Sequence, residues 1–241
     1  MSGGERILVT GGSGLLGAEL QKLLPAAFFP SHREFDVTDF TLMSNYAEGV
    51  EPSLLIHAAA FTSPPRIDEN PQLAIDVNIV GTANVVKLCR AHGARLVYVS
   101  TDYVFDGNKG NYSETDPVHP VNRYAWSKLG GECAVRLYDK ALIVRTSFGE
   151  SEFPYEKAFI DQWTSRIPVG EFASRLVRLI EAGGTGVVHI GAPRRTVLEY
   201  AREISPEKEI GELSLDDVSF VAPKDTSLDT TKYSTIVKRE N

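Results

Sequence analysis

The sequence has little of what marks disulfide-rich, nucleic-acid-binding or membrane proteins. Its two cysteines, Cys89 and Cys133, lie far apart and outside any CxxC pattern, which indicates reduced thiols in a cytosolic protein. The five histidines show no ligand spacing, so no metal is expected. Basic residues number 25 against 32 acidic ones, and no basic run offsets the net charge of -7, so we expect no nucleic-acid partner. No apolar stretch approaches the roughly 20 residues that span a bilayer, and the first residues lack the apolar run of a signal peptide. We therefore expect a cytoplasmic protein without a membrane partner.

Short apolar runs separated by helix-like segments predict the fold. The runs that we interpret as buried strands are 7–9, 54–56, 96–99, 142–144 and 187–190. The clearest helix extends from about Pro71 to Ala91, where Asn70 is suited to cap the start and Pro71 suits the first turn. Nearly all-apolar strands that alternate with helices indicate an α/β fold with a parallel sheet covered on both faces, doubly wound in the Rossmann manner.

Two regions depart from that regular pattern. The second strand is poorly marked, because residues 26–29 are short and closed by Pro30. Proline and glycine gather from Ser147 to Gly170, and the tail after Ser205 is polar. We predict an NAD(P)-binding domain over residues 1–150 and a small, shortened C-terminal substrate lobe over 151–241, with some late segments packing back on the sheet.

Three glycines follow the first strand in a G-x-x-G-x-x-G pattern and open a helix. Gly11 permits the sharp turn, Gly14 lets a pyrophosphate approach the backbone, and Gly17 lets the helix pack close to the sheet. The helix N-terminus offers N–H groups and a partial positive charge to the phosphates. Such a motif alone is equally compatible with a structural turn, but its position favours dinucleotide binding.

The residues that follow the second strand bear on the choice of cofactor. Arg33 and Ser31 are suited to hold a 2′-phosphate, which favours NADPH, whereas Glu34 would instead serve the ribose of NADH. Arg33 is also compatible with a solvated surface charge. We expect NADPH, with NADH as the alternative.

Tyr124 and Lys128 lie four residues apart, on one face of a predicted helix. A lysine ammonium favours the tyrosinate and lowers the pKa of the phenol, which can then pass a proton to a carbonyl oxygen as hydride arrives. Ser100 and Thr101 end the strand at 96–99, where a parallel sheet presents ligand-facing residues. An ordinary amphipathic helix and simple capping hydroxyls are the alternative interpretations.

The motifs together resemble the extended short-chain dehydrogenase/reductases, most closely the dTDP-4-dehydrorhamnose reductase family. The resemblance is carried by TGGSGLLG at 10–17, DVTD at 36–39, HAAAFT at 57–62, Asn78 with Gly81-Thr82, STDYVFDG at 100–107, the Tyr124–Lys128 pair and RTS at 145–147. It implies that Thr101, Tyr124 and Lys128 are the catalytic residues. In this assignment Tyr124 donates the proton, Thr101 orients the substrate carbonyl, and Lys128 also holds the nicotinamide ribose.

The resemblance implies further contacts with cofactor and substrate. Asn78 either supports the active-site geometry or is a buried side chain bonded to backbone, and Val104 and Phe105 are expected to flank the sugar. With Arg33, Asn78, Tyr124 and Lys128, the expected cofactor-binding residues are Gly11, Ser13, Gly14, Leu15, Leu16, Gly17, Asp36, Val37, Ala58, Ala59 and Thr62.

The chain departs from the resemblance in its substrate half. Only residues 150–157 separate the RTSFG segment from Phe159, where members of the family usually continue through a loop and a long helix. We interpret Trp126 and Trp163 as packing residues and the adjacent Glu132 and Cys133 as incidental.

The implied activity is NADPH-dependent reduction of a 4-keto, nucleotide-linked deoxysugar. Two alternatives stay open: an epimerase or dehydratase of the same superfamily, and a non-catalytic, dinucleotide-binding regulatory subunit. The expected partner is the nucleotide-sugar substrate, and a homodimer is one option for assembly.

Overall fold

Four parallel strands form the sheet of the first of two units into which the chain divides. A computed structural model describes residues 4–238. The first unit comprises residues 1–100 and 123–144, and the second comprises 101–122 and 145–241. The division predicted from the sequence, 1–150 and 151–241, stays a prediction about domains, because compactness does not show that a segment folds alone.

The strands of the first unit are β1 (Ile7–Thr10), β2 (Leu54–His57), β3 (Arg95–Val99) and the residues up to Val144 of β4 (Ala141–Thr146). They pair in that order and all in parallel, with Ile7 opposite Leu54, Leu54 opposite Arg95 and Leu96 opposite Ala141. Every residue of β1 and β2 is buried. In β3 and β4 every residue but the first, Arg95 and Ala141, is buried. All four strands were predicted, and burial along nearly their whole length is what a sheet covered on both faces requires.

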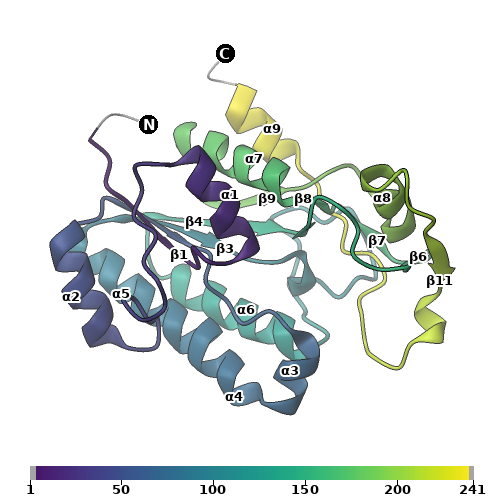
Figure 1. Cartoon of the computed structure of the whole chain (residues 1–241), viewed down its shortest axis with the longest axis horizontal. Helices are drawn as coiled ribbons and strands as arrows, with labels where there is room; N and C mark the ends of the chain where they lie inside the picture. Colours follow the sequence, from purple (N-terminus) through teal and green to yellow (C-terminus); the bar gives the residue numbers. More distant parts are fainter. Residues whose placement is uncertain (1–3, 239–241) are drawn as a thin grey trace. The chain divides into compact units, whose positions relative to one another are not determined.

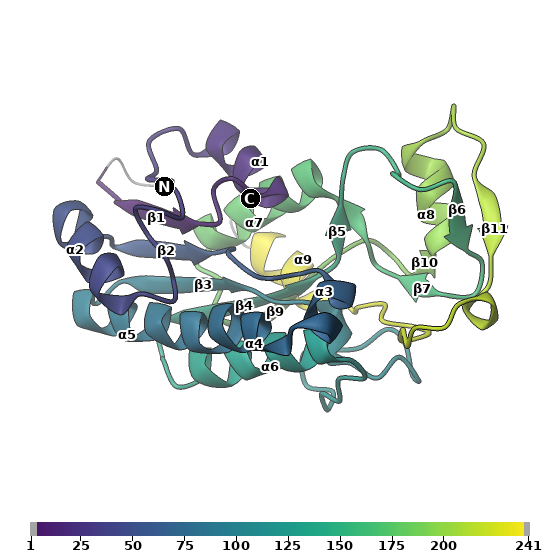
Figure 2. The same ribbon diagram turned by 60° about the horizontal axis from the view of Figure 1, so that its bottom comes forward.

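Helices cover both faces of this sheet. The helix α1 (Leu15–Leu23) lies on one face, and α5 (Thr82–His92) and α6 (Arg123–Val135) lie on the other (Figures 1 and 2). A further helix, α2 (Phe40–Val50), begins at Asp39, whose carboxylate accepts a hydrogen bond from the Leu42 N–H. The doubly wound arrangement predicted from the alternation of strands and helices is confirmed.

The helix expected from about Pro71 to Ala91 is present but not uniform. It consists of α4 (Pro71–Ala74), a π-helical segment η1 (Ile75–Gly81) and α5, and it follows the short α3 (Pro64–Glu69). Asn70 is the N-cap residue, but its side chain makes no capping hydrogen bond, so the predicted cap is wrong in that respect. A π-helical segment often marks a functional position, and this one carries Asn78.

The weak second strand is reduced to a single bridge. Phe28 pairs in parallel with Leu8: its N–H donates to the Ile7 carbonyl at 2.8 Å, and its carbonyl accepts from the Val9 N–H at 2.9 Å. Pro30 follows, and a proline has no N–H with which to continue a ladder.

The second unit contains the predicted strand β9 (Gly186–Ile190), on which α9 (Thr231–Lys238) packs beside α7 (Val169–Glu181). Two short strand pairs lie near its start, β5 (Phe148–Gly149) with β8 (Ile167–Pro168) and β7 (Trp163–Thr164) with β10 (Arg195–Thr196).

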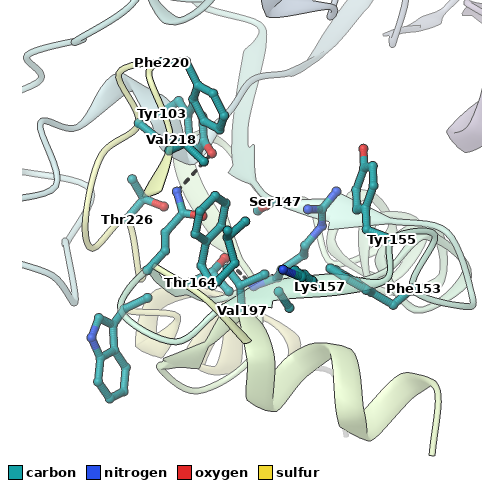
Figure 3. Close-up of a pocket in the computed structure, with 17 residues that line it drawn as sticks. Tyr103, Ser147, Phe153, Tyr155, Lys157, Thr164, Val197, Val218, Phe220 and Thr226 are labelled. Carbon is teal, nitrogen blue, oxygen red and sulfur yellow. Dashed lines mark hydrogen bonds between the residues drawn. The ribbon is translucent and has the colours of Figure 1, made fainter. Parts of the chain in front are cut away.

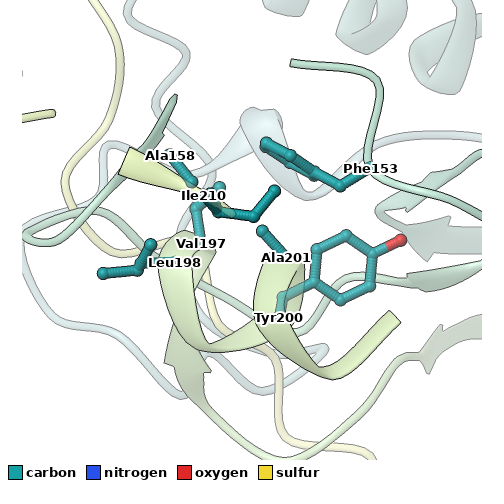
Figure 4. Packing of buried hydrophobic residues seen from close by; sticks show 7 residues of the cluster. All are labelled: Phe153, Ala158, Val197, Leu198, Tyr200, Ala201 and Ile210. Atoms are coloured by element: carbon teal, nitrogen blue, oxygen red, sulfur yellow. The ribbon is translucent and has the colours of Figure 1, made fainter. Parts of the chain in front are cut away.

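A small apolar core holds the rest of the second unit. The helix α8 (Val197–Ile204) packs against β6 (Lys157–Phe159), and β6 pairs with β11 (Gly211–Leu213). This unit also contains two short 3₁₀ turns, η2 (Asp102–Val104) and η3 (Leu215–Asp217). The core residues shown in Figure 4 are Phe153, Ala158, Val197, Leu198, Tyr200, Ala201 and Ile210.

Candidate active site

The glycine turn is built so tightly that two of its glycines cannot carry a side chain. Gly11 has a φ of 76°, and a Cβ there would lie 2.8 Å from the Ala59 nitrogen. A Cβ on Gly17 would lie 2.4 Å from the carbonyl oxygens of both Gly11 and Gly12. These distances are far below van der Waals contact, so the start of α1 packs directly on the glycine turn, and the turn packs directly on the residues that follow β2.

The N-terminus of α1 fits a phosphate group. Its N-cap is Gly14, which has no side chain to occupy the first N–H groups of the helix. Ser13, Gly14 and Leu15 are exposed, whereas Leu16 and Gly17 are buried in the packing of α1. An accessible helix start of this kind attracts anions through its N–H groups and dipole. This cradle is suited to the pyrophosphate of a dinucleotide.

A chain of hydrogen bonds joins this turn to the π-helical segment. The Ala59 N–H donates to Thr10 Oγ1 at 3.1 Å, and Thr10 Oγ1 lies 2.8 Å from His57 Nδ1. On the other side of the ring, His57 Nε2 lies 3.1 Å from Thr82 Oγ1, which donates to the Asn78 carbonyl at 2.7 Å. Because Thr82 donates onward, Nε2 must carry the proton. Complete burial, assisted by Lys128, lowers the pKa of His57 to about 3, in keeping with a neutral ring.

Asn78 is 1% exposed, and both polar atoms of its side-chain amide are hydrogen-bonded to groups of the first unit. Its Oδ1 accepts from the Phe61 N–H at 2.8 Å, and its Nδ2 donates to the Phe61 carbonyl and to Ser127 Oγ at 2.9 and 2.8 Å. Ser127 Oγ in turn donates to the Tyr124 carbonyl at 2.7 Å. Asn78 thus bonds to backbone, as one interpretation predicted, and ties the segment before Thr62 to the helix that carries Tyr124. Its support of the active-site geometry stays a prediction.

The residues expected near the adenosine differ in how accessible they are. Arg33 and Thr62 are exposed, Val37 is buried, and Ala58 and Ala59 are half-buried.

Hydrogen bonds within residues 31–38 occupy some of the polar side chains expected near the adenosine. Asp36 Oδ1 accepts from both the N–H and the hydroxyl of Thr38 at 2.8 Å. Glu34 Oε2 accepts from the N–H and the hydroxyl of Ser31 at 2.9 and 2.7 Å, and these bonds lower the pKa of Glu34. Ser31 and Glu34 therefore satisfy each other, and the exposed Arg33 lies between them in the sequence.

Lys128 is buried at the carboxyl end of β3. Its side chain is 3% exposed, and its Nζ donates to the Val99 carbonyl at 2.9 Å and lies 4.3 Å from the centre of the Tyr98 ring. Burial lowers the pKa of Lys128 to about 7, against the opposing effect of Glu132. Tyr124, one helical turn earlier on α6, is half-buried.

Thr101 begins the second unit and is 6% exposed. Its hydroxyl donates to Asp102 Oδ1 at 3.2 Å, while Asp102 Oδ2 accepts from the Thr226 hydroxyl at 2.6 Å. Burial raises the pKa of Asp102 to about 6, although its hydrogen bonds to Thr226 and Thr101 oppose the shift. Val104 and Phe105 are fully buried, and Phe105 stacks on Tyr112 with ring centres 4.2 Å apart. Their expected contact with a sugar stays a prediction.

A cavity of about 520 Å³ lies within the second unit. Its walls combine aromatic rings such as Phe153 (Figure 3) with polar side chains, among them Gln162 and Arg166. Gln162 Nε2 donates to the Tyr103 hydroxyl at 3.4 Å and to the Pro223 carbonyl at 3.1 Å. The cavity can therefore offer a flat apolar surface and a cation to one ligand.

Sequence reasoning did not identify this cavity. Trp163, interpreted as a packing residue, lies on its wall, and the Arg194 guanidinium carbon sits 3.6 Å from the centre of the indole ring. Lining residues come from segments separated by up to 123 positions, from Tyr103 to Thr226. The sequence signal available for this cavity is a weak likeness to the same family in residues 161–163 and 225–229, which include Gln162 and Thr226.

The described part of the chain extends from residue 4 to residue 238. That part of the chain holds no group of three or more histidine, cysteine, aspartate or glutamate residues arranged to bind a metal ion. It also contains no helix that is long and apolar enough to cross a membrane.

A parallel sheet with a glycine turn between its first strand and first helix is the architecture of Rossmann-type dinucleotide-binding proteins. Comparison with known families narrows this class. The model of the RmlD substrate binding domain matches residues 5–169, and the chain belongs to this family.

Individual relatives agree with the family. The chain is 31% identical to the dTDP-4-dehydrorhamnose reductase of Aggregatibacter actinomycetemcomitans, over 97% of this chain and 88% of that protein. It is also 27% identical to the methionine adenosyltransferase 2 subunit beta of Rattus norvegicus, over 96% and 82% of the two chains. Among solved structures, a dTDP-4-dehydrorhamnose reductase from Bacillus anthracis in complex with NADP has a TM-score of 0.85 and 26% identity, covering 98% of this chain and 96% of that one.

Proposed function

We propose that the protein catalyses the NADPH-dependent reduction of a 4-keto group on a nucleotide-linked deoxysugar, with dTDP-4-dehydrorhamnose as the leading substrate. The observation that carries the proposal is the placement of Lys128, whose buried ammonium lies at the carboxyl end of β3 on the same helix as Tyr124. Ligands of parallel α/β proteins bind at the carboxyl ends of the strands.

Each of three side chains has one task in this reaction. Tyr124 gives its phenolic proton to the carbonyl oxygen, and the Lys128 ammonium stabilises the tyrosinate that results. Thr101 turns its hydroxyl proton, which it donates to Asp102 Oδ1 in this structure, to the same oxygen and so orients the carbonyl. NADPH, when bound, supplies the hydride.

The first unit supplies the residues suited to hold the dinucleotide. Ser13, Gly14 and Leu15 present the accessible start of α1 to the pyrophosphate. Arg33 favours NADPH over NADH, because its exposed guanidinium is available for a 2′-phosphate while Glu34 is engaged by Ser31.

The cavity of the second unit is the proposed site of the nucleotide part of the substrate. Aromatic walls such as Phe153 and Phe159 suit a base, and Arg166 and Lys157 suit a diphosphate. A cavity of about 520 Å³ is in the range of sites for ligands of a few hundred daltons. The shortened segment at 150–157 thus still leaves room for a nucleotide.

A second candidate function is a non-catalytic, dinucleotide-binding subunit of another enzyme. The likeness to a methionine adenosyltransferase subunit beta over 96% of the chain favours this alternative. It predicts NADPH binding without turnover of a nucleotide sugar.

The test follows NADPH oxidation with dTDP-4-dehydrorhamnose generated in situ. Wild-type protein should oxidise NADPH, and Tyr124→Phe should reduce turnover by roughly 10²–10⁴-fold with NADPH binding retained, because a positioned acid contributes about that factor. Tyr46→Phe is the matched control, since Tyr46 packs on Phe35 in the first unit, and it should keep full turnover. Normal turnover by Tyr124→Phe would disprove the assignment of the proton donor. NADPH binding without oxidation by the wild type would favour the regulatory subunit.

A further inference from the structure

Glu132 is a carboxylate with 0% side-chain exposure in the interior of the first unit. It lies on α6 exactly one turn after Lys128, so both side chains project from the same face of the helix. A buried carboxylate is costly unless it is paired and hydrogen-bonded. The contacts of the Glu132 carboxylate therefore indicate the role of its charge.

Ser100 and Arg136 both contact the Glu132 carboxylate. The Ser100 hydroxyl donates to Oε1 at 2.6 Å, which is the short distance typical of a hydroxyl bonded to an anion. Arg136 Nη2 lies 3.9 Å from Oε2, but the Arg136 side chain is 50% exposed and is screened by water. Ser100 directly follows β3 and is itself buried, so the carboxylate is anchored to the end of the strand that also receives the Lys128 ammonium.

The groups around Lys128 leave Glu132 as its counter-charge within the described part of the chain. His57 of β2 is neutral near pH 7, because burial lowers its pKa to about 3. Tyr98 of β3 presents its ring to the ammonium, and burial raises the pKa of its phenol. Tyr124 on α6 also raises the pKa of the Tyr98 phenol. Arg136 carries a positive charge and so is no counter-charge for Lys128. Glu132 opposes the effect of burial on Lys128.

We propose that Glu132 is a positioning residue that keeps the Lys128 ammonium charged at the end of β3, with Ser100 holding its carboxylate in place. The proposal rests on the proposed function for the catalytic role of Lys128. The electrostatic coupling of Glu132 and Lys128 is independent of that function. Glu132, set aside as incidental on sequence grounds, acquires a role because folding buries it beside a cation.

The decisive experiment titrates Lys128 itself. The Cε resonance of Lys128 in ¹³C-labelled protein is assigned by comparison with Lys128→Met. It should report a pKa in Glu132→Gln that is lower by about one pH unit or more than in wild type, because a nearby opposite charge shifts a pKa by about one to three units. The limb of the pH–rate profile on which Lys128 loses its proton should move to lower pH by the same amount. At a given pH on that limb, the turnover of Glu132→Gln should be about tenfold lower than that of wild type. Glu48→Gln, which removes an exposed carboxylate from α2, is the control and should leave both unchanged.

Three outcomes separate the two proposals. An unchanged Lys128 titration in folded Glu132→Gln overturns the positioning role. A shifted titration in a protein that reduces no nucleotide sugar supports the coupling and overturns the reductase. If Glu132→Gln does not fold, Glu132→Asp decides: it keeps the charge, so Lys128 should titrate within about 0.5 pH unit of wild type, and a larger downward shift contradicts the proposal.

Discussion

Thr10 and His57 are the last residues of neighbouring strands, and Thr10 Oγ1 lies 2.8 Å from His57 Nδ1. The two strand ends are thereby locked together directly beneath the glycine turn. Since His57 also reaches Thr82, one neutral imidazole connects β1, β2 and the start of α5. The start of the proposed cofactor site thus depends on a ring that must stay uncharged.

His57→Gln tests that requirement through the pH dependence of stability. The folded state holds His57 neutral with a pKa of about 3, whereas the unfolded chain titrates near 6.5. Between these values the unfolded chain binds the additional proton. Wild-type stability is therefore complete above the upper value and decreases as the pH falls through the window, by up to about 1.4 kcal/mol per pH unit from this group.

His57→Gln lacks this titration, so the free energies of unfolding of wild type and variant should converge as the pH falls from about 7 to about 4.5. Urea unfolding at the two pH values measures the difference. His32→Gln replaces an exposed ring and serves as the control. A stability difference between wild type and His57→Gln that stayed constant with pH would contradict a neutral, buried His57.

Gly17→Ala should damage the glycine turn. The new Cβ would lie 2.4 Å from two backbone carbonyl oxygens, which cannot move without displacing the turn. We expect a loss of about 1–3 kcal/mol in the free energy of unfolding, as for other overpacked sites, and NADPH binding weakened by about tenfold or more. Thermal unfolding and a titration of NADPH fluorescence measure the two effects.

Gly49→Ala is the matched control for this change. Gly49 lies near the end of α2 with open space around its Cα, so an added methyl group meets no atom within 4 Å. Replacing a helical glycine by alanine should stabilise the protein by up to about 1 kcal/mol. Equal behaviour of the two variants would show that the turn tolerates a side chain at position 17.

Arg166→Met tests the cavity of the second unit. Arg166 Nη2 donates to the Phe148 carbonyl at 3.0 Å, which holds the guanidinium on the cavity wall. If it binds a diphosphate, losing that charged hydrogen bond should raise the KM for the nucleotide sugar by about tenfold or more, with the KM for NADPH unchanged. Steady-state kinetics with each substrate varied in turn measures this. Arg178→Met, on the exposed side of α7, is the control, and an equal KM in both variants would place the diphosphate elsewhere.

The main features of the first unit could be predicted because they depend on neighbours along the chain. Apolar runs identified all four of its strands, and the G-x-x-G-x-x-G spacing identified the turn, since both patterns reflect local backbone geometry. The weak second strand was also predicted, because Pro30 ends it. The predicted roles of Thr101, Tyr124 and Lys128 rest on a resemblance and stay predictions.

Other features depend on residues that are distant in sequence. The π-helical segment carries Asn78, whose side chain bonds to Phe61 and Ser127, 17 and 49 positions away. The burial of Val104 and Phe105 follows in the same way from packing within the second unit.

The sequence by itself determined the order of strands and helices, the glycine turn and the spacing of Tyr124 and Lys128, because these follow from backbone conformation and helical periodicity. Tertiary structure alone decided which charges are buried and what surrounds them. Glu132 and Ser100 are ordinary polar residues in the sequence, yet folding places their oxygens 2.6 Å apart in the interior, where water no longer screens a charge. The strength of an electrostatic interaction depends on that loss of solvent, and only packing produces it.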